Sequence, residues 1–476
     1  MRNTNKDRRA SAGWGTTSTR PSSTLSNSGF GNSAISRGQF VKGLGYVGGA
    51  VAAAGLAWGG VAHATGGTTT VVGTNTSPTD ANAIHKAINI DGYDVVYLQG
   101  TFNFGTTDSV LITKDVEIIG QGATIYGGKK PIYSNSGVSL AVRNIRFEDA
   151  TSSAICVTKL FSDRRLEVSN CTIVNVKLGS WLSYPLAIPI AVYTYESATP
   201  GNQDNLTGDV LISGNYLDQN VNEDPAYFAY LQGGIWIGMT RANITISNNE
   251  IYHGSYGGLA IDQNAGTTTI SDNIVHPGML PSAPGFPDSF GQGMWLGLHN
   301  AWGPQGSILV TGNEVKCVNP NADGICLEAR NVVPGTSSVI SNNHVIMENS
   351  TCGALTCYYS IKNSVWTNNN VEGSMVWAIG VLPINPAYIA EHNVFKGNNV
   401  ARVTLLPLGT YGATAANVLF MENANYNTLV GFSGTVADDG IGNTITGYTK
   451  IGRLNPTLGQ TIKDAVAKKH AAMEWE

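Results

Sequence analysis

The sequence predicts an all-β, single-domain solenoid, a parallel β-helix, and three observations lead to that fold class. First, a motif of alternating apolar residues followed by Ser/Thr-x-Asn occurs at Ile244–Ile251 and is repeated with variation along the chain. Second, its copies keep a period, since 24 residues separate Asn249 from Asn273 and 26 separate Asn343 from Asn369. Third, charged residues make up only 13% of the chain and glycine 57 of 476 positions, which suits frequent turns. A fixed period in this range is typical of a stacked repeat.

The motif itself indicates how each coil is built. Alternation of apolar and polar residues is the pattern of a short β-strand. Asparagine tolerates left-handed backbone geometry, so it suits the corner that follows the strand. Its side-chain amide can also bond the equivalent amide in the coils above and below, as in stacked sheets. The expected members of this asparagine ladder are Asn144, Cys171, Asn215, Asn249, Asn273, Asn313, Asn343, Asn369, Asn393 and Asn423. A β-sandwich rich in Ser and Asn would not keep this register.

The amino-terminal part predicts export. Residues 1–64 contain a basic, Ser/Thr/Gly-rich segment that we expect to be disordered. Ser36–Lys42, the apolar run Gly43–Val61 and Ala62–Ala64 then follow in the order of a secretion signal. The motif resembles the twin-arginine type, with Gly38 in place of the second arginine. An uncleaved membrane anchor is the alternative, but the glycines of the run make it a poor one. We expect cleavage after residue 64 and a secreted or cell-surface protein.

Three further segments follow the signal. Residues 65–94 are predicted to form a linker and an amino-terminal cap helix, because Ser77–Asp80 carries helix-start signals. Residues 95–450 are predicted to form the β-helix, and 451–476 a carboxyl-terminal helical segment. The net charge of −5 is modest, and no basic face is evident. A nucleic-acid binder needs clustered Lys and Arg to displace counterions, so that class is excluded. No stable membrane insertion is expected once the signal is removed.

The six cysteines fall into near pairs along the sequence. These pairs are Cys156 with Cys171, Cys317 with Cys326, and Cys352 with Cys357. In an exported protein each pair could close a disulfide within one coil. The alternative is six small buried residues, which the cysteine in a ladder position supports. No Cys-x-x-Cys or Cys/His spacing is present, so no metal site is predicted from them.

The first coils resemble a known family. After the cap helix come Val96–Phe102 and Leu111–Gly120, which are similar to the opening of right-handed parallel β-helix repeat proteins of the pectate-lyase-like superfamily. The repeat covers about 95–447. The resemblance implies a right-handed helix and a superfamily that holds lyases, galacturonases, epimerases, phage tailspikes and proteins with no known reaction. The galacturonase signature and the pectate-lyase calcium and arginine motifs are absent, so no catalytic residue is carried over.

Two intervals between ladder residues are longer than one coil. They span 44 residues from Cys171 to Asn215 and 40 from Asn273 to Asn313. Insertions in a solenoid project as loops, often on the binding face. Aromatic residues in these loops and in the aligned strands are candidates for stacking on sugar rings: Trp181, Tyr184, Trp236, Phe286, Phe290, Trp295 and Trp302. The alternative is that the rings only hold the loops against the wall.

A second strand can be aligned from coil to coil. Its expected inward residues are Ile237, Ile261, Leu296, Leu327, Ile361 and Ile379. The residue after each then points outward, because side chains alternate along a strand. That outward column is Gly238, Asp262, Gly297, Glu328, Lys362 and Gly380, followed two positions later by Thr240, Asn264, His299 and Arg330. Coils stack about 4.8 Å apart, so Asp262 and Glu328 are expected about 10 Å apart across Gly297. The candidate catalytic residues are therefore Asp262, His299, Glu328, Arg330 and Lys362.

This column allows several functions. Two carboxylates about 10 Å apart lie near the upper end of the inverting-glycosidase range of about 6.5–9.5 Å. In a lyase, Arg330 or Lys362 would abstract a proton, with Ca²⁺ held by Asp262 or Glu328. The alternative without chemistry is an ion-pair ladder of Glu328 with Lys362. The leading prediction is a secreted protein that binds and cleaves an extracellular polysaccharide, lyase- or glycoside-hydrolase-like. The alternative function is a non-catalytic cell-surface or adhesion protein.

Overall fold

The computed structural model describes most of the predicted solenoid. The residues described are 66–177, 179–181, 184–193, 206–219, 231–253, 257–278, 292–297, 306–318, 322–329, 338–384, 387–406, 416–431, 433–452, 460 and 463–464. All of them belong to one compact unit, Ala62–Glu476. The predicted export signal at 1–64 lies outside these residues. Within the part described, no helix is long and apolar enough to cross a membrane.

Three rows of parallel strands form the wall of the solenoid. The first row is a sheet with the order β1 (Thr68–Val72), β2 (Val95–Gln99), β5 (Val116–Gly120), β8 (Leu140–Arg143), β11 (Arg165–Ser169), β16 (Asp209–Ser213), β19 (Asn243–Ser247), β22 (Thr268–Ser271), β25 (Ile308–Thr311), β28 (Ser338–Ser341), β30 (Ser364–Thr367), β33 (Val394–Lys396), β37 (Thr428–Val430) and β39 (Thr444–Thr446). β1 already pairs with β2, so the first coil begins within the segment expected to be linker and cap.

The second row follows the first around one corner. Its strands are β3 (Thr101–Asn103), β6 (Thr124–Tyr126), β9 (Arg146–Glu148), β12 (Thr172–Val174), β17 (Tyr216–Asp218), β20 (Glu250–Tyr252), β23 (Ile274–His276), β26 (Glu314–Cys317), the first parts of β29 (His344–Tyr359) and β31 (Asn370–Leu382), and β34 (Asn399–Leu405).

The third row closes each coil. Its strands are β4 (Val110–Ile112), β7 (Ile132–Ser134), β10 (Ile155–Val157), β15 (Ile190–Tyr193), β18 (Leu231–Thr240), β21 (Gly257–Asn264), β24 (Gln292–Gly297), β27 (Ile325–Ala329), the second parts of β29 and β31, β35 (Val418–Phe420), β38 (Thr435–Asp438) and β40 (Thr449–Lys450). Beside the rows lie the antiparallel pair β13 (Gly179–Trp181) and β14 (Tyr184–Ala187), and the pair β32 (Ala390–Glu391) and β36 (Ala424–Asn425).

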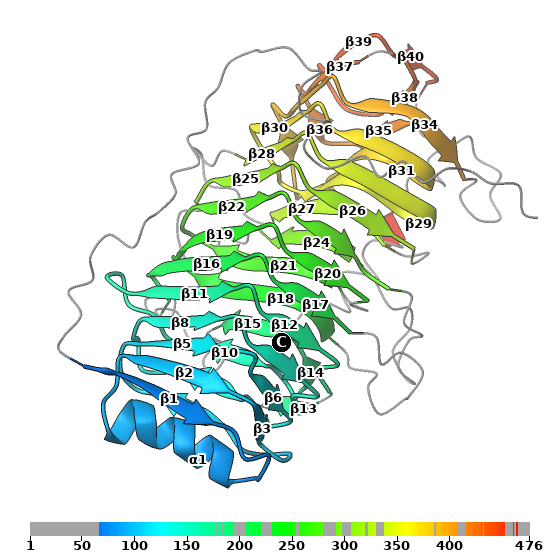
Figure 1. The fold of residues 1–476 in the computed structure, drawn as a ribbon. Coiled ribbons are helices and arrows are strands. Elements are labelled where there is room, and N and C mark those ends of the chain that lie inside the picture. Colours follow the sequence, from blue (N-terminus) through cyan, green and yellow to red (C-terminus); the bar gives the residue numbers. More distant parts are fainter. Residues whose placement is uncertain are drawn as a thin grey trace, which may run out of the picture. The chain divides into compact units, whose positions relative to one another are not determined.

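Each strand pairs with the equivalent strand of the next coil. β19 pairs with β22, β20 with β23 and β21 with β24, all in parallel register. The strands of the first row are stacked one above another in Figure 1. Residues that point inward from all three rows form one continuous hydrophobic core, with large rings such as Trp366 and Phe395 stacked 5.9 Å apart between centroids. The predicted parallel β-helix is confirmed.

The asparagine ladder is confirmed over most of its length. The Asn249 side-chain Nδ2 donates to Asn273 Oδ1 at 2.9 Å, and the Asn249 main-chain N–H donates to the same oxygen at 3.0 Å. The residue before each ladder position has a positive φ, as at Asn248 with 56°. The described members that donate in this way are Asn215, Asn249, Asn273, Asn313, Asn343 and Asn369. At the ends of the ladder, Cys171 donates to Asn215 through its main-chain N–H alone, and Asn398 accepts from Asn369.

Three of the expected ladder members are wrong. Asn369 bonds Asn398 rather than Asn393. Asn393 belongs to a separate ladder with Ser364, Asn427 and Asn443, at the corner that leads into the first row. Asn144 and Asn423 have φ of 58° and 68° and precede the inward positions of their corners. The cause is that Ser/Thr-x-Asn marks any left-handed corner, and each coil has more than one.

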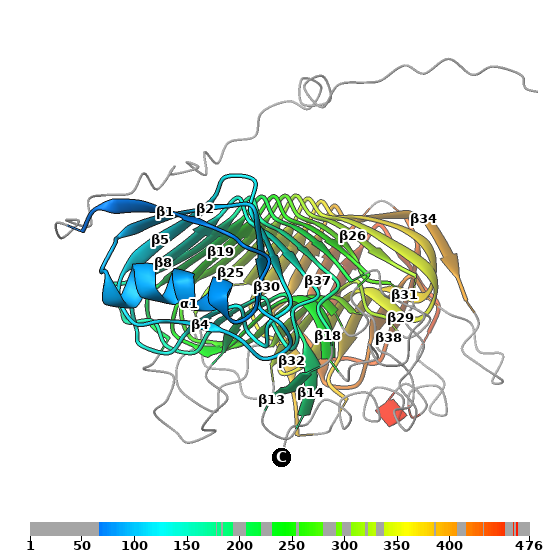
Figure 2. The same ribbon diagram turned by 60° about the horizontal axis from the view of Figure 1, so that its bottom comes forward.

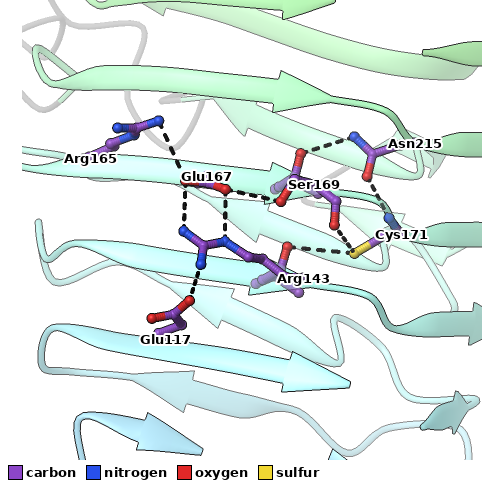
Figure 3. A network of polar contacts seen from close by, with 9 residues as sticks. Glu117, Arg143, Arg165, Glu167, Ser169, Cys171 and Asn215 are labelled. Carbon is purple, nitrogen blue, oxygen red and sulfur yellow. Dashed lines mark hydrogen bonds and ion pairs between the residues drawn. The ribbon is translucent and has the colours of Figure 1, made fainter. Parts of the chain in front are cut away.

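A charged cluster covers the outer face of the first row near its start (Figure 3). Arg143 donates to Glu167 through Nε at 2.8 Å and Nη2 at 3.0 Å, and it also bonds Glu117. Burial opposes the charge on Arg143, but the hydrogen bonds and charges of the two glutamates outweigh it and raise the Arg143 pKa. Ser169 donates to Glu167 at 3.0 Å. These residues belong to β5, β8 and β11, so the cluster links three consecutive coils.

The cap helix predicted before the first coil is α1 (Thr79–His85), continued by a π-helical turn, η2 (Lys86–Ile90). It lies across the end of the stack in Figure 2. Asp80 in its first turn is 1% exposed and accepts four hydrogen bonds: from Thr74 N–H and Oγ1 at 2.8 Å each, Thr76 N–H at 2.9 Å and Asn103 N–H at 2.8 Å. Burial opposes ionisation of this carboxyl, but the hydrogen bonds prevail and lower the pKa of Asp80. This carboxylate ties the cap to the first coils.

The predicted disulfide pairs are wrong, because the described part of the chain contains no disulfide bond. The two cysteines of each expected pair lie on opposite faces of the strands that form the solenoid wall. Cys171, Cys317 and Cys357 lie in the inner core, whereas Cys156, Cys326 and Cys352 lie in or against a second cluster on the outer face of the third row. Burial raises the pKa of the Cys171 thiol to about 12. The alternative of small buried residues fits five of the six, and Cys352 is partly exposed.

Candidate functional site

The strands of the third row are buried on both faces from β15 to β31. Every residue of β24 is buried, and so is every residue of β27. Inward, Ile237, Ile261, Leu296 and Leu327 have no exposed surface, as predicted. Outward, apolar residues form the second cluster, which includes Tyr193, Trp236, Ala260, Trp295, Cys326, Tyr358, Trp377 and Leu382. A strand buried on both faces loses the alternation of apolar and polar residues.

Two carboxylates share one outward column within this apolar face. Asp262 pairs with Gly297, and Gly297 pairs with Glu328, which confirms the predicted register at these positions. Two strand spacings separate the carboxylate positions, about 10 Å along the solenoid. The exposed fractions are 4% for Asp262 and 1% for Glu328, so both carboxyl groups are desolvated.

The predicted column is wrong beyond Glu328. Glu328 pairs with Tyr358, and Tyr358 pairs with Leu382. Lys362 and Gly380 therefore do not belong to the column of Asp262 and Glu328. Lys362 forms an isolated bridge with Glu391, and its Nζ lies 2.7 Å from Glu391 Oε1. The expected ion-pair ladder of Glu328 with Lys362 is wrong for the same reason.

Hydrogen bonds hold a second polar group beside the column. Tyr358 donates its hydroxyl to both oxygens of Asp323, at 3.1 and 3.0 Å, and Thr356 Oγ1 donates to the same carboxylate at 3.2 Å. Burial, followed by the charge of Asp323, raises the pKa of Tyr358 well above its usual value. The phenol therefore keeps its proton and remains a donor. In the other direction, Trp295 Nε1 donates to Glu328 Oε2 at 3.0 Å.

Gln292 at the start of β24 is buried, and its amide has no hydrogen-bond partner among the described residues. It has no exposed surface, and within the described part of the chain neither its Nε2 nor its Oε1 has a hydrogen-bond partner. The next residue, Gly293, donates its N–H to the Asp323 carbonyl at 2.9 Å, so Gln292 lies one coil from Asp323. Nearly all buried polar groups in folded proteins are hydrogen-bonded. An amide left over in this way is suited to a bound water or ligand.

Thr240 and Asn264 are paired in register, as predicted, but their polar groups serve the corner. Thr240 Oγ1 donates to Asn264 Oδ1 at 2.7 Å, and Asn264 Nδ2 donates to Thr268 Oγ1 at 2.8 Å. Both residues are buried, at 0% and 3% exposed. This contact therefore stabilises the turn into the first row.

Comparisons with known proteins agree with this architecture. Residues 82–301 match the protein family described as "Right handed beta helix region". This match agrees with the right-handed parallel β-helix fold of the chain. No curated protein matches the chain in sequence.

Several solved structures show a weak likeness to this chain. The Dettilon tailspike protein gp208 has 13% identity and a TM-score of 0.35, over 80% of this chain and 68% of that one. The periplasmic alginate epimerase AlgG has 9% identity and a TM-score of 0.30, over 76% and 77%. The Azotobacter vinelandii mannuronan C-5 epimerase AlgE4 A-module has 11% identity and a TM-score of 0.28, over 79% and 92%. At these TM-scores the likeness carries no further inference about this chain.

The remaining predicted site residues divide into two groups. Trp236 and Trp295 are part of the outward cluster, at 5% and 4% exposed, and Tyr193 lies 5.3 Å from Trp236 between ring centroids. Trp181 and Tyr184 belong to β13 and β14, which pair with each other beside the third row. The other candidates, His299, Arg330, Phe286, Phe290 and Trp302, lie outside the described residues.

Sequence reasoning missed Gln292, Asp323 and Tyr358. Gln292 and Asp323 each precede a glycine, Gly293 or Gly324, at the corner between the second and third rows. A Cβ on either glycine would come within 2.2 or 2.4 Å of a core valine, so only glycine fits. That recurring glycine before an apolar strand was the available signal. Tyr358 was missed because the column was misaligned. Among the described residues, no group of three or more His, Cys, Asp or Glu could hold a metal ion.

Proposed function

We propose that the outward face of β21, β24, β27 and β29 binds an extracellular polysaccharide and cleaves it, with Asp262 and Glu328 as the acid/base pair. The observation that carries the proposal is the shared column, with Gly297 as the position between the two carboxylates. A glycine there places no side chain between the two carboxylates. The spacing of about 10 Å is close to the inverting-hydrolase range, in which a water fits between the carboxylate and the sugar.

The neighbouring groups support a sugar ligand. Gln292 offers both a donor and an acceptor, which matches a sugar hydroxyl. Trp236 and Trp295 offer aromatic surface close to the column. In hydrolysis one carboxyl group protonates the leaving glycosidic oxygen, and the other carboxylate takes a proton from the attacking water. In a lyase reaction a base removes a proton beside a uronate carboxylate. Arg330 is the remaining candidate for that base, because Lys362 is bonded to Glu391.

The test uses the mature protein and a panel of uronate and neutral glycans. Reducing ends report hydrolysis, and ultraviolet absorbance of unsaturated uronates reports elimination. We expect Asp262→Asn and Glu328→Gln each to lower turnover by about a hundredfold or more, in line with the size of acid/base contributions. Glu391→Gln, which breaks an ion pair away from this face, is the matched control and should keep wild-type turnover. Full activity in both site variants would contradict the proposal.

A second candidate function is a non-catalytic surface or adhesion protein. The burial of both carboxyl groups among apolar side chains favours it, since catalytic groups need access to substrate. In this alternative the wild-type protein gives no product with any glycan of the panel, and Asp262→Asn and Glu328→Gln change only stability. Product formation by the wild-type protein excludes it.

A further inference from the structure

The outer face of the second row carries aromatic rings and carboxylates in neighbouring coils. Each ladder residue is followed by an outward residue, then an inward one, then a second outward one. In β17, β20, β23 and β26 these outward positions, with the residue after β20, form what we call the ring face: Tyr216, Asp218, Glu250, Tyr252, His253, Ile274, His276, Glu314 and Lys316. Unlike the third row, this row is polar and partly open to solvent.

The rings of the ring face are close to one another. The centroids of Tyr216 and Tyr252 lie 5.6 Å apart, and those of Tyr252 and His276 lie 5.4 Å apart with an interplanar angle of 81°. These residues come from three consecutive coils, because β17 pairs with β20 and β20 with β23. Tyr216 is 38% exposed, so a ring remains available to a ligand.

Carboxylates hold the two tyrosine rings along their strands. Tyr216 donates its hydroxyl to Asp218 Oδ2 at 3.0 Å, and Tyr252 donates to Glu250 Oε2 at 3.3 Å. Each bond joins residues two positions apart, so the ring lies lengthwise over its own strand. Burial, together with the nearby carboxylates, raises the pKa of both tyrosines, which keeps the hydroxyls protonated. A side chain fixed in this way loses little freedom when a ligand binds.

We propose that the ring face is a binding site for a linear, neutral polysaccharide that lies along the solenoid axis. Coils repeat about every 4.8 Å, close to the length of one sugar unit, so consecutive sugars would meet consecutive coils. The C–H faces of sugars stack on the rings of Tyr216 and Tyr252. Sugar hydroxyls donate to Asp218, Glu250 and Glu314, since a carboxylate accepts about four hydrogen bonds and each is only partly used.

The charge of the ring face selects the class of glycan. Asp218 and Glu314 are bonded to His253 and His276, at 2.7 and 3.0 Å. Asp218, Glu250 and Glu314 give the ring face three carboxylates, whereas the Nζ of its lysine, Lys316, lies 2.8 Å from a further carboxylate, Glu348. A polyuronate would meet like charges here, whereas a neutral glycan meets acceptors. The ring face belongs to a different row from Asp262 and Glu328, so this proposal does not depend on the proposed function.

The competing explanation is structural. Aromatic pairs on neighbouring strands stabilise a sheet by about 0.2–1 kcal/mol without any ligand. A variant must therefore separate binding from stability. Tyr126 provides the control, because it lies on the same row in β6, is 43% exposed and donates to Asp149 at 2.7 Å. Its register partner is Glu148 rather than a ring.

The experiment is affinity electrophoresis in gels that contain a soluble neutral β-glucan or, separately, polygalacturonate. We expect the neutral glucan to retard the wild-type protein and Tyr126→Ala alike. Tyr216→Ala/Tyr252→Ala should bind about tenfold more weakly or worse, a loss of about 1.4 kcal/mol. Polygalacturonate should retard Tyr216→Ala/Tyr252→Ala and the wild-type protein equally.

A second pair of substitutions keeps the test decisive if the alanine variant fails to fold. Tyr216→Leu/Tyr252→Leu covers the strands with apolar side chains but removes the flat rings, and it should lose the same affinity. Circular dichroism establishes that each variant is folded. Retardation of a folded ring variant equal to that of the wild-type protein overturns the proposal. So does a wild-type protein that no neutral glucan retards.

Discussion

Two buried side-chain amides in this molecule differ in how many hydrogen bonds they form. Asn249, at the corner between the first and second rows, has no exposed surface and uses its whole amide. It donates to Asn273 and to the Ile212 carbonyl, and it accepts from Asn215 at 2.9 Å. Gln292, at the start of β24 in the third row, is equally buried, yet within the described part of the chain its amide has no partner.

The difference separates a structural position from a candidate ligand position. A buried amide with all its hydrogen bonds contributes to stability, whereas an unpaired one costs free energy. A stack of identical corners can satisfy every amide, because each coil supplies the partner of the next. The third row has no such repetition on its outer face, where residues differ from coil to coil. Substitutions at the two kinds of position should therefore differ in size and even in sign.

The largest effect is expected in the ladder. Asn249→Ala removes the acceptor used by Asn215 and the donor used by Asn273, so it should lower the free energy of unfolding by about 1–3 kcal/mol. Asn248→Gly is the matched control, because Asn248 is exposed and has a φ of 56° that glycine adopts without strain. It should change stability by about 0.5 kcal/mol or less. Equal denaturation midpoints for the two variants would contradict the assignment of the ladder position.

The ladder was predictable because its residue type and its strand pattern repeat together. Asn249 and Asn273 were found from the sequence for that reason. The prediction failed at Asn393, where the second ladder at another corner gave nearly the same interval. It also failed for the outward column after Glu328, because β29 has register shifts between Met347 and Ser350 and between Ser350 and Gly353. An irregular strand cannot be aligned by counting.

The candidate site was only partly predictable for a related reason. Asp262 and Glu328 were placed together by the alternation of the inward residues Ile261 and Leu327, which is undisturbed in those coils. Tyr358 was not, because both faces of its strand are apolar and the alternation vanishes. The ring face was not predicted, although the positions of its two tyrosines follow from the ladder. Tyr216 follows Asn215 by one residue and Tyr252 follows Asn249 by three, so the ladder period already assigns them to the outer face.

A smaller effect, dependent on pH, is expected at the cap. Asp80→Asn replaces a carboxylate that accepts four hydrogen bonds and should cost about 1.5 kcal/mol at neutral pH. Because the folded-state pKa of Asp80 is lowered, its stabilisation is complete above the unfolded value of about 3.9. It is lost as the pH falls through the folded value. Denaturant unfolding of the two proteins from pH 7 to pH 3 should therefore show a difference that is constant and then shrinks at the acid end. A difference that grows on acidification would contradict the role of the ionised carboxylate.

The smallest effect on stability is expected at Gln292, and it tests directly whether the two buried amides differ. Gln292→Leu replaces a buried amide that has no partner among the described residues by an apolar side chain of similar size. Since no hydrogen bond is lost, the melting temperature should stay unchanged or rise, in contrast to Asn249→Ala. If the amide serves a sugar hydroxyl, the same variant should bind the cleaved glycan about tenfold more weakly, the size of one lost hydrogen bond. Calorimetry gives the first quantity and KM or Kd for the glycan the second. A melting temperature that falls as far as that of Asn249→Ala would mean that the amide is a structural group and that the two regions do not differ.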